Sequence, residues 1–185
     1  MEFNIREATL DDVSAISVLG RMTYKEHFAD IWNDSESFLN ADFSIEAIKS
    51  CINSPSSHRY LLAFRNNMLV GFAKLNINFE LNGMGKPCIE LQKIYVKKDS
   101  VGNNLGSALI ERVVELASEL NSKYVWLDVL KNNVQAQKFY QRHQFGIVDE
   151  IAYKTDKYEI GMFVMVKRLK NTAVCGVSQA EDTSN

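Results

Sequence analysis

Residues 90–145 restrict what this 185-residue chain can fold into more than any other part of it. The segment opens with an apolar run typical of a strand (ELQKIYV), then a turn that contains glycine (VGNNLG), then apolar residues at helical spacing. A second apolar run (WLDVL) and a second amphipathic stretch (VQAQKFYQRHQF) follow. We therefore expect strand, turn, helix, strand and helix in this order. A strand that turns through glycine into a helix leaves backbone N–H groups without partners, and these can bind an anion.

Polar residues mark two further helices in the first third of the chain. Thr9 or Asp11 can cap a helix, and residues 24–32 either continue it or lead out of it. Ser44 can cap a second helix that runs to residue 51. The polar stretch at residues 33–40 between them is predicted to be irregular.

Alternating and continuous apolar runs predict the strands of one sheet. They lie at residues 3–6, 59–65, 68–78, 89–96, 124–130, 147–151 and 160–169. Asn66–Asn67 predicts a tight hairpin, because asparagine tolerates a positive φ, and residues 82–87 (NGMGKP) predict another turn. Strands joined partly by hairpins and partly by helices predict an α/β or α+β fold with a mixed sheet.

Composition narrows the class of protein. An apolar fraction of 46% suits one globular domain, which we place at residues 1–170, and the small polar residues at 171–185 predict a disordered tail. Lys plus Arg number 21 against 23 Asp plus Glu, a balance that argues against a nucleic-acid partner. Three cysteines far apart predict neither a disulfide framework nor a metal site. With no apolar run of about 18 residues, we expect a cytoplasmic chain that does not enter a membrane.

Three stretches resemble the GNAT superfamily of N-acetyltransferases, in order and at the expected spacing. They are IREATLDD near the start, LQKIYVKK followed by the glycine turn, and N-x-x-A-x-x-F-Y at residues 133–140. The resemblance covers residues 5–169 and implies a mostly antiparallel central sheet flanked by helices. TYKEHF and ELQKIYVKKDS further resemble a bacterial subgroup that acetylates spermidine and spermine. The turn departs from the family pattern at Val101 and Asn104, and Gln144 stands where the family has glycine.

The resemblance implies acetyl-CoA as cosubstrate and no metal. Backbone N–H groups of the turn and of the following helix would bind the pyrophosphate, and the preceding strand would pair with the pantetheine arm. The cofactor-binding residues predicted in this way are Ile94, Tyr95, Val96, Val101, Gly102, Asn103, Asn104, Leu105, Gly106, Ser107, Asn133 and Tyr140.

Acyl transfer to an amine needs a base, an oxyanion donor and an acid. The family suggests a backbone N–H near Ile94 or Tyr95 as the oxyanion donor. Tyr140 is the predicted acid for the leaving thiolate, although by position alone it could be a core aromatic residue. Relatives often carry a carboxylate at the position of Gln92, whose amide cannot take a proton. Gln92 and Glu90 are two residues apart on one strand, so we expect them on one face.

Glu90 or Asp128 is therefore predicted to act as the base or to bind a cationic amine, and Asp128 could equally be a hydrogen-bonded strand residue. His27, His58 and His143 are interpreted as structural or exposed. The predicted reaction is direct attack by a primary amine, with a small polyamine-like acceptor. A protein N-terminus or lysine as acceptor, and a non-catalytic CoA-binding module, are the alternatives. The sequence leaves open whether the chain acts as a monomer or a homodimer.

Overall fold

The computed structural model describes residues 3–81, 87–102 and 104–170. The predicted tail at 171–185, most of the predicted turn at 82–87 and Asn103 lie outside these ranges. No helix in the described ranges is both long and apolar enough to cross a membrane.

A seven-stranded sheet runs through the molecule in the order β1-β2-β3-β4-β5-β7-β6. Its strands are β1 (Asn4–Glu7), β2 (His58–Arg65), β3 (Met68–Ile77), β4 (Cys88–Val96), β5 (Tyr124–Leu130), β6 (Gly146–Lys154) and β7 (Glu159–Arg168). Every neighbouring pair is antiparallel except β4 and β5, which are parallel. The predicted mixed, mostly antiparallel sheet is thus confirmed.

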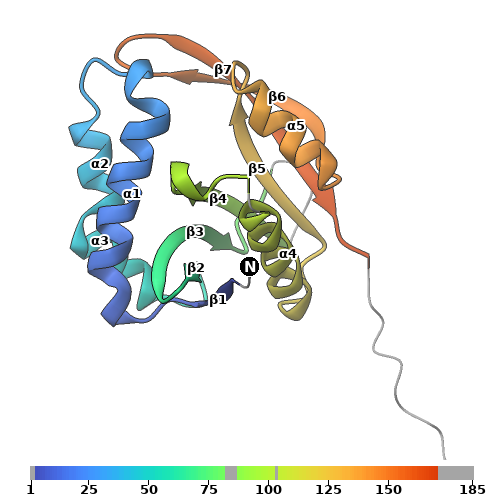
Figure 1. Cartoon of the computed structure of the whole chain (residues 1–185). Helices are drawn as coiled ribbons and strands as arrows, with labels where there is room; N and C mark the ends of the chain where they lie inside the picture. Colours follow the sequence, from blue (N-terminus) through green and yellow to red (C-terminus); the bar gives the residue numbers. More distant parts are fainter. Residues whose placement is uncertain (1–2, 82–86, 103, 171–185) are drawn as a thin grey trace, which may run out of the picture.

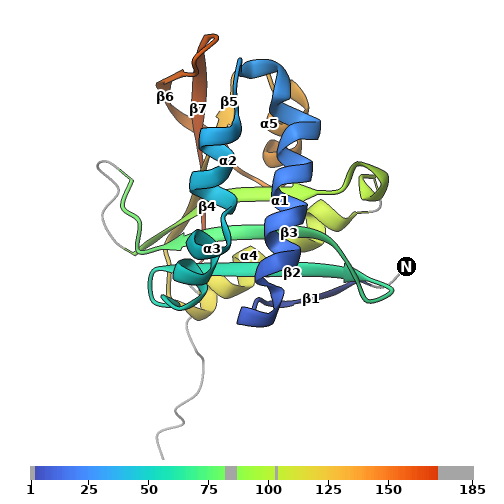
Figure 2. The ribbon, with the colours of Figure 1, turned by 90° about the vertical axis from the view of Figure 1, so that its left-hand side faces the viewer.

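Helices cover both faces of this sheet (Figures 1 and 2). One face carries α1 (Val13–Phe28), α2 (Glu36–Phe43) and α3 (Ile45–Ile52), and the other carries α4 (Leu105–Glu119) and α5 (Val134–Arg142). Three short 3-10 turns, η1 (Leu10–Asp12), η2 (Ala29–Ile31) and η3 (Lys98–Ser100), join these elements.

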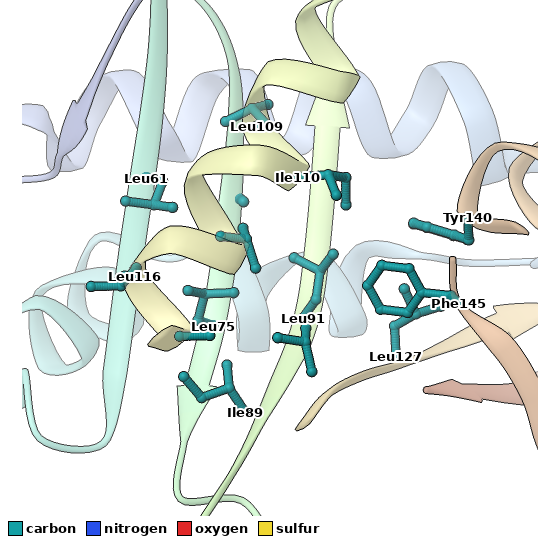
Figure 3. Close-up of a cluster of buried hydrophobic side chains, with 14 of the residues drawn as sticks. Leu61, Leu75, Ile89, Leu91, Leu109, Ile110, Leu116, Leu127, Tyr140 and Phe145 are labelled. Carbon is teal, nitrogen blue, oxygen red and sulfur yellow. The ribbon is translucent and has the colours of Figure 1, made fainter. Parts of the chain in front are cut away.

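Each face has its own hydrophobic core. Under α4, the helix residues Leu109, Ile110 and Leu116 face the strand residues Leu61 and Leu75 (Figure 3). Under α1–α3, a second core contains Ile16, Leu19, Leu39, Phe43, Ile48, Leu62 and Phe72. Full burial of one such side chain contributes about 1.5–3 kcal/mol, so these cores fix the helices on the sheet.

Local signals in the sequence set several element boundaries. The Ser44 hydroxyl accepts a hydrogen bond from the backbone N–H of Ala47 (3.2 Å), which confirms the predicted cap of α3. Asn66 and Asn67 have φ of 51° and 60° and form the predicted hairpin turn. The predicted irregular stretch at 33–40 was wrong, because α2 begins at Glu36. Leu39 and Phe43 are four residues apart and completely buried, so burial outweighs the polar residues around them.

Candidate functional site

Strands β4 and β5 pair over three residues only and then diverge. The paired positions are Cys88 with Tyr124, Ile89 with Val125, and Glu90 with Trp126. Beyond Glu90 the two described strands share no register, and Figure 1 shows them separating. We call this separation the β4–β5 opening and the Glu90–Trp126 pair its vertex. One edge of β4 is thus available to an extended ligand that can hydrogen-bond like a strand.

The β3–β4 ladder determines which β4 groups point into this opening. Lys97 donates its backbone N–H to the carbonyl of Val70 (2.9 Å), so this residue faces β3. Residues of an antiparallel ladder alternate between bonding to the neighbour and facing away from it. Tyr95 therefore bonds toward β3, whereas Ile94 and Val96 direct their N–H and C=O groups into the opening. Of the two oxyanion donors that the family suggests, this geometry favours Ile94.

A β-bulge at Gln92 changes the side-chain pattern of β4. Lys74 pairs with Lys93 and Leu75 pairs with Leu91, so Gln92 has no opposite residue. A bulge shifts the alternation by one residue, and Leu91 and Ile94 accordingly join the same core under α4. Simple alternation along β4 therefore cannot be extended past Gln92.

The glycine turn lies at the other end of β4, where α4 begins. Gly102 has φ of 89° and Asn104 has φ of 60°, so asparagine takes the left-handed conformation for which the family pattern uses glycine. Ala108 makes the first backbone bond of the helix, to the carbonyl of Asn104 (2.9 Å). The N–H groups of Leu105, Gly106 and Ser107 are therefore free of intrahelical acceptors and can meet an anion.

Other predicted cofactor residues differ in how they could contribute. Val101 is 60% exposed and carries no polar side-chain group. Asn133 caps α5, because its side-chain oxygen accepts the N–H of Ala136 (3.1 Å). Gly106 lies so close to α5 that an added Cβ would be 3.2 Å from Cζ of Phe139. The small residue thus allows α4 and α5 to approach each other.

Tyr140 lies on α5 in the core beside the opening. Its ring packs against Phe139 and Phe145, and only 9% of the residue is exposed. Burial raises the pKa of its hydroxyl well above the usual range, so the group stays protonated. The hydroxyl makes no hydrogen bond to any residue within the described ranges.

Glu90 and Asp128 lie near each other on the face covered by α1–α3. Asp128 is two residues beyond Trp126, which pairs with Glu90 at the vertex. Burial, and then the charge of Glu90, raises the pKa of Asp128 to about 6. Its Oδ1 is buried with no hydrogen-bond partner among the residues that the structure describes. A carboxylate in this state can take a proton near neutral pH.

Glu90 has a different environment, built by a polar row across three strands. His58 Nδ1 lies 2.8 Å from the Asn76 side-chain oxygen, and the Asn76 amide donates to Glu90 Oε2 (2.6 Å). The pKa of Glu90 is raised overall, because the effect of burial exceeds the opposing effects of Asn76, Lys93, Lys74 and His58. The two carboxyl groups therefore differ, since Glu90 has groups that stabilise its charge and Asp128 has none.

Sequence reasoning missed most of this row and the residues around it. Lys74 and Asn76 are buried polar residues within the apolar strand β3, a signal that could have been noticed. Lys93 is buried in an ion pair with Asp42 of α2 (2.6 Å), which no pattern in either segment indicated. Within the described residues, no group of three His, Cys, Asp or Glu side chains could hold a metal ion.

Aromatic residues line the same face above the opening. Tyr24 of α1 stacks on Phe38 (ring centroids 4.5 Å apart) and meets Tyr95 edge-on (6.5 Å). Trp32 donates its indole N–H to the Tyr24 hydroxyl (2.5 Å). Aromatic rings on this face can attract an organic cation.

The turn between β6 and β7 is fastened to the linker between α1 and α2. Asp156 accepts the backbone N–H groups of Asn33 (2.9 Å) and Asp34 (3.0 Å), and Lys157 donates to the carbonyl of Asp30 (3.0 Å). The hairpin arches from the sheet to the end of α1 in Figure 1. This contact, the β6–β7 clasp, joins the two sides of the molecule above the opening.

Comparison with known proteins assigns the family. Residues 22–145 match the acetyltransferase (GNAT) family, which is more than half of the chain. The chain therefore belongs to the GNAT family of N-acetyltransferases, whose cosubstrate is acetyl-CoA. An uncharacterised N-acetyltransferase of Mycobacterium bovis is 27% identical over 133 residues, which are 72% of this chain and 81% of the relative. A probable spermine N(1)-acetyltransferase of Bacillus subtilis subsp. natto is 27% identical over 130 residues, 68% and 82% of the two chains.

Solved structures show the same fold. An N-acetyltransferase of Thermoplasma acidophilum in complex with coenzyme A superimposes with a TM-score of 0.74 at 23% identity, covering 91% of this chain and all of the other. A putative acetyltransferase of Salmonella typhimurium with acetyl-CoA gives 0.70 at 17% identity, over 96% of this chain and 100% of the other. These likenesses agree with the mixed, mostly antiparallel sheet flanked by helices.

Proposed function

We propose that this N-acetyltransferase acetylates a primary amine of a small cationic acceptor, of polyamine type, by direct attack, with Asp128 as the base. The observation that carries the proposal is the state of the Asp128 carboxyl group. It is buried beside the vertex, lacks a hydrogen-bond partner among the described residues and has its pKa raised to about 6.

Acetyl-CoA lies along the β4–β5 opening with its diphosphate at the start of α4 and its thioester near the vertex. The free N–H groups at the start of α4 meet the diphosphate, since a helix N-terminus favours negative charge. Ile94 and Val96 offer backbone groups to the amide-bearing pantetheine arm, as a neighbouring strand would. Acetyl-CoA supplies the acetyl thioester. This direction brings the thioester toward the vertex, where Glu90 and Asp128 lie.

The carboxyl groups of Glu90 and Asp128 have different roles toward the amine. Glu90, held by the Asn76 amide, binds the acceptor as an ammonium ion. An ammonium ion has a pKa near 10 and no lone pair, so it must lose a proton before it attacks. Asp128 takes that proton, because its own pKa of about 6 leaves it ionised at neutral pH.

Two further groups act on the thioester. The backbone N–H of Ile94 donates to the oxygen on which negative charge develops. The Tyr140 hydroxyl remains protonated and donates to the departing sulfur, whose proton affinity resembles that of a cysteine thiolate. Asp128 and Tyr140 therefore have the protonation states that a base and an acid require at neutral pH.

A small cationic acceptor is favoured over a protein chain. The aromatic residues Tyr24 and Tyr95 and the carboxyl groups of Glu90 and Asp128 suit a flexible amine. The β6–β7 clasp ties Asp156 to Asn33 and Asp34 and so limits access for a bulky polypeptide. The Bacillus subtilis relatives named for spermine and spermidine point the same way.

Release of free thiol from acetyl-CoA, measured with a panel of amines, tests the proposal. The panel contains spermine, spermidine, putrescine, a peptide with a free N-terminus and a lysine peptide. We expect turnover with the polyamines and a loss of about 10²-fold or more in Asp128→Asn. Asp149→Asn, an exposed change on β6, is the matched control. Faster turnover of a peptide would replace the proposed acceptor, and binding of acetyl-CoA without thiol release from any amine would favour a non-catalytic module.

A further inference from the structure

A hydrogen bond connects the two helices that flank the β4–β5 opening. Ser107, in the first turn of α4, has its Oγ 3.1 Å from Nε2 of His143 at the end of α5. Ser107 belongs to the predicted phosphate-binding turn, whereas His143 was expected to be structural or exposed. The pair therefore links the start of α4 to the helix that carries Tyr140.

Both the ring and the backbone of His143 are held by neighbouring residues. Its ring packs edge-on against Phe139 (centroids 4.8 Å apart), and Phe139 itself contacts Gly106 of α4. The His143 carbonyl accepts a hydrogen bond from Lys167 Nζ of β7 (2.8 Å). Because backbone and ring are both fixed, Nε2 is directed at the Ser107 hydroxyl.

The direction of this hydrogen bond decides what Ser107 can offer a ligand. A hydroxyl has one hydrogen to donate, and phosphate oxygens only accept at neutral pH. If Ser107 donates to His143, it turns lone pairs toward the phosphate. If His143 donates to Ser107, the serine hydrogen is left for the phosphate. We infer that His143 is a positioning residue that donates from Nε2 to Ser107 and so makes Ser107 a donor to the cofactor diphosphate.

The surroundings of His143 fit this role. Partial burial, with Lys167 and Arg142 near, lowers the pKa of the imidazole, while Glu111 opposes the shift. The neutral ring carries one proton, and placing it on Nε2 satisfies both Ser107 and the phosphate. The contribution is a fixed hydrogen bond and requires no positive charge. The inference rests on the proposed binding of the diphosphate at the start of α4 and does not depend on the identity of the amine acceptor.

Binding of two ligands by calorimetry tests the inference. Coenzyme A carries the diphosphate, and pantetheine has the same arm without it. The variants are Ser107→Ala, His143→Leu, His143→Gln and the double variant Ser107→Ala/His143→Leu. Glutamine has an amide nitrogen at the place of Nε2 and can still donate. Ser118→Ala, in the last turn of the same helix, is the matched control, because among the residues that the structure describes its hydroxyl bonds only to the Val114 carbonyl.

We expect Ser107→Ala to weaken coenzyme A about 10- to 100-fold, as for a lost hydrogen bond to a charged group, and His143→Leu to weaken it about 5- to 10-fold. The double variant should bind like Ser107→Ala, because His143 acts through Ser107. His143→Gln and Ser118→Ala should bind like the unchanged protein, and pantetheine affinity should be the same throughout.

Several results would overturn the inference. They are coenzyme A affinity unchanged in His143→Leu, equal weakening of pantetheine in that variant, and failure of His143→Gln to restore binding. A different result would overturn the proposed diphosphate site instead. If the unchanged protein binds coenzyme A and pantetheine equally well, the diphosphate does not bind at the start of α4. Melting temperatures of every variant confirm that folded proteins are compared.

Discussion

Replacing Asp128 by asparagine should stabilise the protein while removing its base. Asparagine has nearly the same shape and cannot ionise. In the folded protein the pKa of Asp128 is raised from 3.8 to about 6, mainly because burial disfavours the charged form. The unfolded carboxyl group ionises first as pH rises, so stability is lost between these two values and stays lost above pH 6. The variant does not incur this loss.

The shift of about two pH units sets a ceiling of ~3 kcal/mol on the effect. Because Asp128 is only partly buried, solvent screening reduces the expected gain to about 1–2 kcal/mol. For a chain of this size, such a gain corresponds to a melting temperature about 3–6 °C higher above pH ~7. Below pH ~3 the two proteins should melt together, since the carboxyl group of the unchanged protein is then mostly protonated in both its folded and its unfolded state.

Thermal melts of the unchanged protein, Asp128→Asn and the exposed control Asp149→Asn at a series of pH values test this reasoning. The gain should grow from pH ~4 to ~7 only in Asp128→Asn. A lower melting temperature for Asp128→Asn at neutral pH would refute the argument, because it would mean that the carboxylate is stabilised by partners. A gain that does not depend on pH would show that ionisation of Asp128 is not its cause.

Three other changes probe the remaining parts of the site. Tyr140→Phe keeps the packing against Phe139 and Phe145, so melting temperature and acetyl-CoA affinity should be unchanged while kcat falls about 10²-fold. An unchanged kcat in steady-state assays would exclude the acid role. Asn76→Leu removes the donor to Glu90, so it should lower the free energy of unfolding by about 1–3 kcal/mol in thermal melts and raise the KM of the amine acceptor in initial-rate assays. An unaltered KM would mean that Glu90 does not bind the amine. Asp156→Ala breaks the β6–β7 clasp, so the backbone amides of Asn33 and Asp34 should exchange hydrogen faster by NMR, while core amides keep their rates. Unchanged exchange rates at Asn33 and Asp34 would show that the clasp does not hold the linker.

Local chemistry in the sequence predicted much of the fold. Ser44 as a cap, Asn66–Asn67 as a hairpin turn and the apolar spacing of α4 each act within a few residues of themselves. The left-handed conformation of Asn104 follows equally from its residue type. In contrast, α2 was missed because it forms through burial of Leu39 and Phe43 against distant elements.

The site depends more on tertiary structure than the fold does. The Gln92 bulge arises from pairing with β3 and changes which faces the β4 side chains occupy. The residue types of Glu90 and Asp128 identified them as candidates, but their different environments come from Asn76, Lys93 and the divergence of β5. The Ser107–His143 contact joins residues 36 positions apart, and no local pattern indicates it.

The pH dependence of kcat/KM with spermidine, in the unchanged protein and in Asp128→Asn, tests the central claim most directly. If ionised Asp128 deprotonates a bound ammonium ion, kcat/KM of the unchanged protein rises to a plateau above pH ~6, since the pKa of Asp128 is about 6, and falls only near the amine pKa of about 10. The variant should lack this plateau and gain activity steadily toward pH ~10, as the free amine forms in solution. An identical profile for both proteins would contradict the assignment of Asp128 as the base.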